Sequence, residues 1–302
     1  MIKRRFHTLD VFTRNRFSGN PLAVVLDAEG MSDGDMQAVA REFGLSETVF
    51  VFPDPEKRHR ALLRIFTPAR ELAFAGHPTV GTAFLLALLD QAGKPGSVAF
   101  GLSEKIGTIS CAADVESTER GYVQFRLPEL SRRWGNGKET VGCAWALGLE
   151  PKDIGFERHE PSRYSAGTKY DLVPVASLDA LARAKVNRDA FDQVFGDSDH
   201  VAAFLYCRDG DPSEKRFRAR MFPAGLGVDE DPATGSAVAA FSGALMQFEP
   251  MGDGEHLFTI RQGYEMGRPS EIVLRALLEG GSMAFAEIGG HVVLVSQGEI
   301  QG

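Results

Sequence analysis

Two short motifs place polar side chains in front of apolar segments that could form helices. The segments HPTVGTA at residues 77–83 and DPATGSA at residues 231–237 share the pattern x-P-x-x-G-[ST]-A. A polar residue followed by proline is typical of a helix N-cap and the first helical position. Free N–H groups of a first helical turn, together with the helix dipole, form a site for an anion. The motifs therefore predict two helix ends that could hold a carboxylate or an enolate.

The residues inside these motifs suit proton transfer. Glycine allows close approach and the next hydroxyl can donate, so Gly81-Thr82 and Gly235-Ser236 are expected in the first turns. A positive helix end favours a neutral His77 and an ionised Asp231. Helix capping by Asp231, or a histidine satisfied within the core, is the alternative interpretation of these residues.

Glu47 stands between a predicted helix that ends at Gly44 and an apolar stretch, TVFVF, at residues 48–52. Two interpretations stay open on spacing alone. Glu47 is either a solvated charge that protects a strand end or an acid/base group of an active site.

The spacing of other reactive residues excludes several chemistries. The chain has no HExxH or HxH pair, no GxSxG elbow, no GxxxxGK[ST] loop and no GxGxxG after a strand. Cys111, Cys143 and Cys207 lack CxxC spacing and are expected to be reduced core residues. We therefore predict no metal site and no cofactor.

The elements that position these residues can be predicted from hydrophobic spacing. Met36, Val39, Ala40 and Phe43 predict an amphipathic helix over residues 32–43. Residues 78–89 and 232–246 carry no charge and are apolar on every side, which predicts two buried helices. Strands outnumber helices, and we predict them at residues 6–12, 22–26, 48–52, 61–66, within 97–127, and at 170–175, 200–207, 215–222, 257–262, 271–277 and 283–296.

An internal repeat relates the two halves of the chain. The two glycine motifs begin 154 residues apart, and Arg64-Ile65-Phe66 and Arg220-Met221-Phe222 lie 156 apart. We predict two related domains, residues 1–120 and 121–285, with the last strand, about 286–298, a candidate to return to the first. Within the boundary window of residues 118–165, residues 131–139 are the most linker-like.

Composition limits the class of partner. The chain has 302 residues, 43% of them hydrophobic, and a formal net charge of −8. Such a chain can bury a core, and its charge disfavours nucleic acid or an anionic membrane as a partner. The N-terminus lacks a signal-peptide pattern and no apolar run reaches the ~20 residues of a membrane span. We expect a cytoplasmic protein that acts on a small molecule.

Five motifs, in order, make the sequence similar to the PhzF-like family, whose architecture is that of diaminopimelate epimerase. They are FSGNPLAVV at 17–25, LSETVFV at 45–51, RIFTPARELAFAGHPTVGTA at 64–83, DEDPATGSA at 229–237 and QGYEMGRPS at 262–270. The resemblance implies an α+β fold of two pseudo-symmetric domains. In each, a curved, mostly antiparallel sheet wraps a central buried helix, and the active site lies in the cleft between the domains.

The resemblance also implies roles for residues. Glu47 would be the principal acid/base, moving a proton between two carbons of the substrate without a cofactor. His77 and Asp231 would assist, and Gly76, Gly235 and Ser236 would bind substrate. Relatives are commonly dimers, so a homodimer is expected. Neither repeat motif holds a cysteine, which disfavours the two-cysteine chemistry of diaminopimelate epimerase.

The substrate is not carried over from the resemblance. The isomerase that gives the family its name has alanine after the aspartate, where this chain has Pro232. We expect a small molecule with a carboxylate and an acidic C–H. An epimerase or lyase would share the first chemical step, and a binding protein that retains the cleft is a further alternative.

Overall fold

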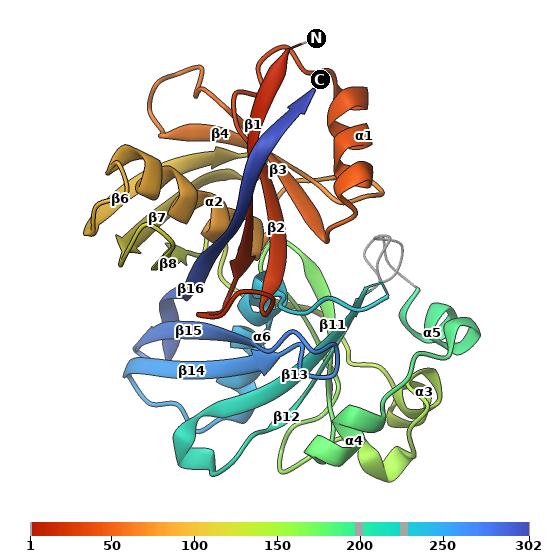
Figure 1. Cartoon of the computed structure of the whole chain (residues 1–302). Helices are drawn as coiled ribbons and strands as arrows, with labels where there is room; N and C mark the ends of the chain where they lie inside the picture. The colour runs from red at the N-terminus through yellow and green to blue at the C-terminus, as the bar shows by residue number, and fades with distance from the viewer. Residues whose placement is uncertain (1, 197–201, 224–228, 302) are drawn as a thin grey trace.

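The computed structural model describes residues 2–196, 202–223 and 229–301. These residues form two lobes, with the two termini side by side at the outer end of the first lobe (Figure 1). The first lobe contains β1 (Lys3–Val11), β2 (Asn20–Val25), α1 (Asp33–Phe43), β3 (Glu47–Phe52), β4 (Ala61–Phe66), β5 (Glu71–Leu72), α2 (Gly76–Asp90), β6 (Gly96–Glu104), β7 (Gly107–Val115) and β8 (Arg120–Arg126).

The second lobe follows with more helices around its sheet. It contains β9 (Arg132–Gly135), α3 (Thr140–Ala146), β10 (Ser162–Ser165), β11 (Lys169–Pro174), α4 (Leu178–Arg183), α5 (Arg188–Phe195), β12 (Ala202–Arg208), β13 (Arg216–Pro223), α6 (Gly235–Phe248), β14 (Gly254–Gln262) and β15 (Ser270–Glu279), with 3₁₀ turns at Pro151–Asp153 and Pro212–Glu214. The last strand, β16 (Ser282–Gln301), begins in the second lobe and returns to the first, where it pairs with β1.

All the described strands belong to one hydrogen-bonded sheet that runs through both lobes. Its order is β1-β2-β3-β4-β6-β7-β8-β16-β15-β14-β13-β12-β11-β10-β9, β5 pairs with β4, and a β1–β16 pairing closes the first lobe. Each lobe has the same two parallel pairings in a mostly antiparallel sheet: β2–β3 and β4–β6 in the first, β11–β12 and β13–β14 in the second. This repetition confirms the predicted α+β fold. The domain boundary near residue 120 stays a prediction.

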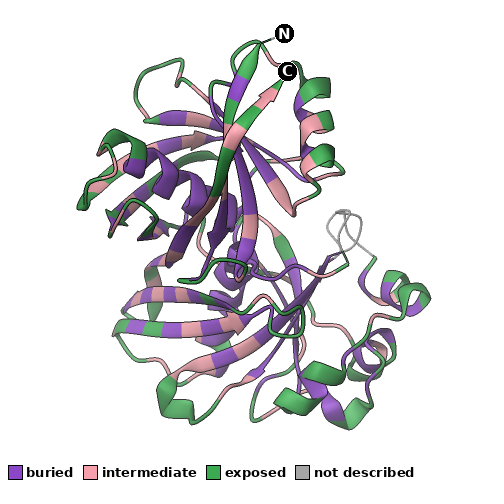
Figure 2. Cartoon of the chain, in the orientation of Figure 1, coloured by how far each residue is buried: buried purple, intermediate pink, exposed green. Residues whose placement is uncertain are grey.

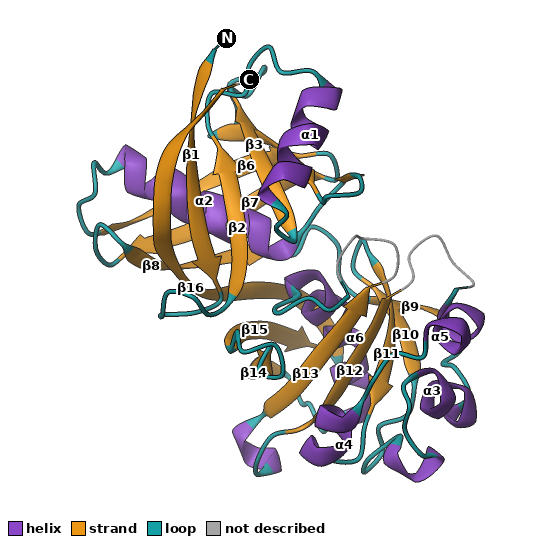
Figure 3. Ribbon diagram, turned by 45° about the vertical axis from the view of Figure 1, so that its right-hand side comes forward, coloured by secondary structure: helices purple, strands orange, loops and turns teal. Residues whose placement is uncertain are grey.

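Each lobe wraps its sheet around one helix. Helices α2 and α6 are buried over nearly their whole length, whereas α1 is exposed on one side (Figure 2). The two buried helices predicted from charge-free segments are thus confirmed. The N-terminal ends of α2 and α6 point toward the junction of the lobes (Figure 3).

The predicted helix starts are wrong by a few residues. Helix α2 begins at Gly76 after Ala75, so His77 is its second residue and not its cap. The reason is that the Thr79 N–H donates to the Ala75 carbonyl, which closes the first turn early.

In the second lobe the helix starts later than the proline. Helix α6 begins at Gly235 after Thr234, four residues beyond Asp231. The Asp231 N–H donates to the Met221 carbonyl and the Asp231 carbonyl accepts from Gln262, so the chain cannot turn into the helix there. Neither motif forms the predicted cap followed by proline.

The expectation for Gly81-Thr82 is also wrong. Gly81 is the sixth residue of α2, and a Cβ atom there would stand 2.5 Å from Leu22 and 2.9 Å from Val11. This glycine therefore permits close packing of α2 on the sheet and does not lie at the helix tip.

Helix α1 matches its prediction closely. The Ser32 hydroxyl accepts from the Asp35 N–H, the Asp35 carboxylate closes the capping box, and Gly44 ends the helix in the left-handed conformation at φ 61°.

Several elements have no sequence prediction. Helices α3, α4 and α5 and strands β5, β9 and β10 are short, and β9 lies inside the stretch predicted to be a linker, where it pairs with β10. Cys111, Cys143 and Cys207 are buried and unpaired, as predicted. Within the described residues, no helix has the length and hydrophobicity that a membrane span requires.

Candidate active site

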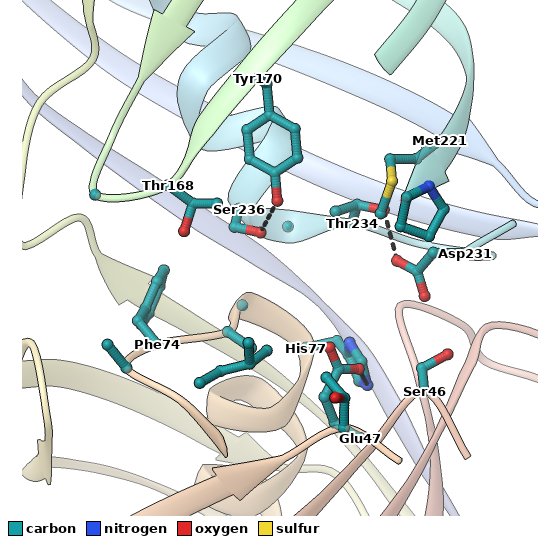
Figure 4. Close-up of a pocket in the computed structure, with 18 of the residues that line it drawn as sticks. Ser46, Glu47, Phe74, His77, Thr168, Tyr170, Met221, Asp231, Thr234 and Ser236 are labelled. Atoms are coloured by element: carbon teal, nitrogen blue, oxygen red, sulfur yellow. Dashed lines mark hydrogen bonds and ion pairs between the residues drawn. The ribbon is translucent and has the colours of Figure 1, made fainter. Parts of the chain in front are cut away.

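The first residues of α2 and α6 meet where the two lobes join. A Cβ atom built on Gly76 would stand 2.9 Å from the Gly235 Cα and 3.1 Å from the Ser236 nitrogen. The two helix N-termini border a cavity of about 140 Å³ (Figure 4). Its lining comes from both lobes: Ser46, Glu47, Thr67, Arg70, Leu72, Ala73, Phe74, Ala75, Gly76, His77, Ile106, Gly167, Thr168, Tyr170, Met221, Pro223, Asp231, Thr234, Gly235 and Ser236.

Glu47 is the first residue of β3, which pairs in parallel with β2 and thereby directs this side chain into the cavity. The side chain is 13% exposed. Its buried Oε2 has no hydrogen-bond partner within the described part of the chain and lies 3.3 Å from Nε2 of His77. Burial, followed by the negative charge of Asp231, raises the pKa of Glu47 well above its usual value. A solvated charge at a strand end does not fit this environment.

His77 lies beside Glu47 with its ring almost fully enclosed, at 4% side-chain exposure. Burial lowers the pKa of His77 to about 3, so the imidazole is neutral near pH 7. Its Nδ1 atom faces the amide nitrogen of Asn20 at 3.1 Å. The histidine thus has one ring nitrogen toward Glu47 and the other toward Asn20.

Asp231 reaches the same cavity from the second lobe. Its Oδ1 accepts from the Asn20 amide at 2.8 Å and its Oδ2 accepts from the Thr234 hydroxyl at 2.5 Å. Burial raises the pKa of Asp231 to about 6, against the opposing effect of hydrogen bonds from Thr234, Asn20 and Ser46. Asp231 is therefore mainly ionised at neutral pH, although it does not cap α6 through a backbone N–H.

Ser236 is the second residue of α6, and its hydroxyl lies 2.7 Å from that of Tyr170 (Figure 4). Ser236 and Tyr170 lie across the cavity from Glu47 and His77 (Figure 4), and Gly235 lines the same cavity. The structure thus brings together all six residues predicted for the site, Glu47, Gly76, His77, Asp231, Gly235 and Ser236, whose roles stay predictions.

Sequence reasoning missed three polar residues that organise this site, Asn20, Gln262 and Tyr170. Asn20 and Gln262 lie within motifs that carried the family resemblance, so a signal for them existed, although Asn20 was assigned only to a turn. Gln262 is fully buried and binds both the Asp231 carbonyl and the Thr234 backbone N–H. No sequence pattern indicated Tyr170.

One cluster of possible metal ligands occurs among the described residues, away from this cavity. The carboxylates of Glu157 and Glu249 and the His159 ring have ligand atoms within 4.8 Å of one another. Arg208 forms ion pairs with both carboxylates at 2.7 Å, which offsets the charge that a cation would need.

The cavity combines groups that can exchange a proton with a bound anion. A buried carboxyl of raised pKa faces a neutral imidazole, and two helix N-termini supply N–H groups for negative charge. The profile of the phenazine biosynthesis-like protein family (PhzC-PhzF) matches residues 9–298.

The chain belongs to the phenazine biosynthesis-like family. It is 44% identical, over 99% of both chains, to an uncharacterized isomerase of Mesorhizobium japonicum. It is 32% identical, over 97% of both chains, to the trans-2,3-dihydro-3-hydroxyanthranilate isomerase of Pseudomonas chlororaphis. The crystal structure of a PhzF-family protein from Bacillus anthracis matches all of both chains with a TM-score of 0.87 and 25% identity. Together these similarities identify this member of the family as an isomerase.

Proposed function

We propose that this isomerase moves a proton between two carbons of a small carboxylate-bearing substrate, without a cofactor, through Glu47. The observation that carries the proposal is the position of Glu47 Oε2: buried, without a hydrogen-bond partner in the described chain, and facing the cavity between two helix tips. A carboxyl of raised pKa is matched to proton exchange with carbon near neutral pH.

The proposed reaction conserves protons and electrons. The Glu47 carboxylate takes a proton from one carbon, the C–H electron pair moves into the conjugated system, and the Glu47 carboxylic acid returns the proton to another carbon. Negative charge that develops on the substrate would face the N–H groups of Gly76, His77, Gly235 and Ser236, at the positive ends of α2 and α6.

The cavity wall supports a substrate with both an anionic and an apolar part. Leu72, Phe74, Ile106 and Met221 supply apolar lining, and the two helix tips supply N–H groups. The relative from Pseudomonas chlororaphis is named for trans-2,3-dihydro-3-hydroxyanthranilate, a carboxylate. This compound is therefore the first of a panel of unsaturated carboxylates to be tested.

The test follows substrate C–H signals by ¹H NMR in D₂O. We expect wild-type protein to convert at least one carboxylate of the panel, and Glu47→Gln to be slower by about 10² or more. Glu42→Gln, a neutralisation of an exposed glutamate on α1, should leave the rate unchanged. A folded Glu47→Gln protein with the wild-type rate would overturn the proposal.

Product analysis separates the related outcomes. A double bond moved to a new position supports the isomerase, inversion at a single carbon indicates an epimerase, and loss of a leaving group indicates a lyase. Binding of carboxylates without conversion and without exchange of any C–H would instead favour a binding protein that retained the cleft.

A further inference from the structure

One side-chain amide joins three groups around the proposed catalytic carboxyl. Asn20, the first residue of β2, is fully buried. Its Nδ2 atom lies 3.1 Å from Nδ1 of His77, 2.8 Å from Oδ1 of Asp231 and 2.8 Å from the Ala233 carbonyl oxygen. Asn20 and His77 belong to the first lobe, and the other two residues belong to the second.

These neighbours fix which way the amide points. A backbone carbonyl can only accept, so the Asn20 nitrogen and not its oxygen must face Ala233. The same holds for the Asp231 carboxylate, which accepts from Thr234 on its other oxygen. A flipped amide would place an oxygen against two oxygens at 2.8 Å.

The orientation of the amide then decides the state of the His77 ring. The two hydrogens of the Asn20 amide face three acceptors, so one N–H is shared between two of them. An amide nitrogen cannot accept a hydrogen bond, so Nδ1 of His77 must present its lone pair to Asn20. A neutral imidazole carries one N–H, and the second ring nitrogen must hold it. That nitrogen, Nε2, lies 3.3 Å from Oε2 of Glu47.

We infer that Asn20 is a positioning residue that holds His77 in the tautomer with its proton on Nε2, the ring nitrogen beside Glu47. The inference rests on the proposed function of Glu47. It makes Nε2 a protonated neighbour of the carboxyl, close to it but outside hydrogen-bond geometry, and not a second base.

This tautomer has two consequences for proton transfer. The Nε2–H group stabilises the Glu47 carboxylate, which is otherwise disfavoured by burial and by the charge of Asp231. Once Glu47 has taken a proton from the substrate, Nε2 has no lone pair to accept it. The proton therefore stays on Glu47 for return to the substrate. In the opposite tautomer, the lone pair of Nε2 could accept this proton from Glu47.

The test reads the tautomer directly in the full-length protein. A ¹⁵N NMR spectrum of protein labelled with [¹⁵N]histidine is recorded at pH 7. The His77 signals are assigned by their absence from the spectrum of His77→Gln. We expect the shift of an unprotonated nitrogen at Nδ1 and of a protonated nitrogen at Nε2. The Nδ1–H tautomer in wild-type protein would overturn the inference without any variant.

Asn20→Asp replaces the donor with an acceptor and should invert the tautomer, with a proton on Nδ1 and a lone pair on Nε2. Asn15→Asp adds the same charge at an exposed position five residues earlier and should leave His77 unchanged. A folded Asn20→Asp protein that keeps the Nε2–H tautomer would contradict the inference. If Asn20→Asp does not fold, Asn20→Ser is used, and we expect a detectable population of the Nδ1–H tautomer. A spectrum of Asn20→Ser that shows only the wild-type tautomer would contradict the inference.

The spectra need no substrate, so the two proposals fail separately. A wrong tautomer removes the role of Asn20 and leaves the assignment of Glu47 intact. A correct tautomer in a protein that converts no substrate of the panel removes the function proposed for Glu47 and retains the role of Asn20.

Discussion

Gly76 and Gly235 are in backbone contact across the junction of the two lobes. The ideal Cβ position on Gly76 is 2.9 Å from the Cα of Gly235, a distance that no real Cβ atom keeps. Each glycine is the first residue of its helix, so this contact sets the separation of the two N-termini that border the cavity.

Gly76→Ala should therefore force the helix tips apart. Both obstacles, the Gly235 backbone and the Ser236 nitrogen, are main-chain atoms that cannot rotate away. We expect a loss of about 1–3 kcal/mol in the free energy of unfolding and a fall of at least about tenfold in kcat/KM. Urea denaturation and the exchange assay measure these two effects.

Gly34→Ala is the matched control for this substitution. Gly34 lies in the first turn of α1, where a new Cβ would meet nothing closer than 3.7 Å. Alanine is the better helix former, so this variant should be as stable as wild type or slightly more stable. Equal behaviour of the two variants would show that the glycine contact does not constrain the site.

Removing the charge of Asp231 should lower the pKa of Glu47. Burial is the larger cause of the raised pKa and the negative charge of Asp231 is the second. Asp231→Asn keeps the side-chain shape and one oxygen, for either Thr234 or Asn20, but loses the repulsion, so the carboxylate form of Glu47 becomes easier to reach. We expect a downward shift of the Glu47 pKa in a ¹³C NMR titration of its carboxyl.

Asp229→Asn provides the comparison for Asp231. Asp229 lies two residues before Asp231, and its side chain is 89% exposed and paired with Arg188. The substitution therefore removes one negative charge from the surface. Solvent screens such a charge, so the Glu47 titration should not move. A shift of the same size in both variants would rule out a direct interaction with Asp231.

Glu104 should make the stability of the protein depend on pH. This side chain is 4% exposed, and the Thr79 hydroxyl donates to its Oε1 at 2.6 Å. Burial raises the pKa of Glu104 to about 8 in the folded protein, against an ordinary value of 4.5. The folded state holds this proton more tightly than the unfolded state, so its contribution to stability is lost as pH rises from about 4.5 to about 8.

Glu104→Gln removes that dependence because the amide does not titrate. Relative to wild type, the variant should gain up to about 4 kcal/mol in the free energy of unfolding between pH 5 and pH 8. Denaturant titrations at several pH values measure the gain, and the exposed Glu42→Gln should show none. A constant difference between Glu104→Gln and wild type across this range would mean that Glu104 is already ionised in the fold.

The two buried helices could be predicted because their segments lack charge, but their starting residues could not. Paired glycine motifs suggested equivalence at an offset of 154, whereas the helices begin at Gly76 and Gly235, 159 residues apart. The cause is a long-range contact. Gln262, the last residue of β14, binds the Asp231 carbonyl and the Thr234 N–H and delays the start of α6. Local sequence does not contain that contact.

The site shows the same limit. Glu47 could be assigned to the site only through the family resemblance, since its position at a strand end is equally typical of a solvated charge. Its burial depends on residues from the other lobe, as does the role of Asn20, whose acceptors Asp231 and Ala233 are more than 200 residues away. Tyr170 meets Ser236 only where β11 packs beside α6 within the second lobe, 66 residues apart in sequence.

The repeat of Arg-apolar-Phe does mark equivalent positions and makes a final prediction. Arg64 in β4 forms a two-point ion pair with Glu71, and Arg220 in β13 forms the same pair with Glu230. The side chains of the first pair are 26% and 25% exposed, and those of the second are 9% and 15% exposed.

Arg220 also donates to three carbonyls near the end of α4, those of Leu181, Ala182 and Ala184. Arg220→Met should therefore lower the free energy of unfolding by about 3–5 kcal/mol, because it leaves a buried carboxylate and buried carbonyls without a donor. Arg64→Met, its counterpart in the repeat, should lose only about 1 kcal/mol, since water can reach the atoms it leaves. Urea denaturation of both variants gives the comparison directly. A larger loss for Arg64→Met would show that the enclosed carbonyls near α4 contribute less than the solvent-exposed ion pair of the first lobe.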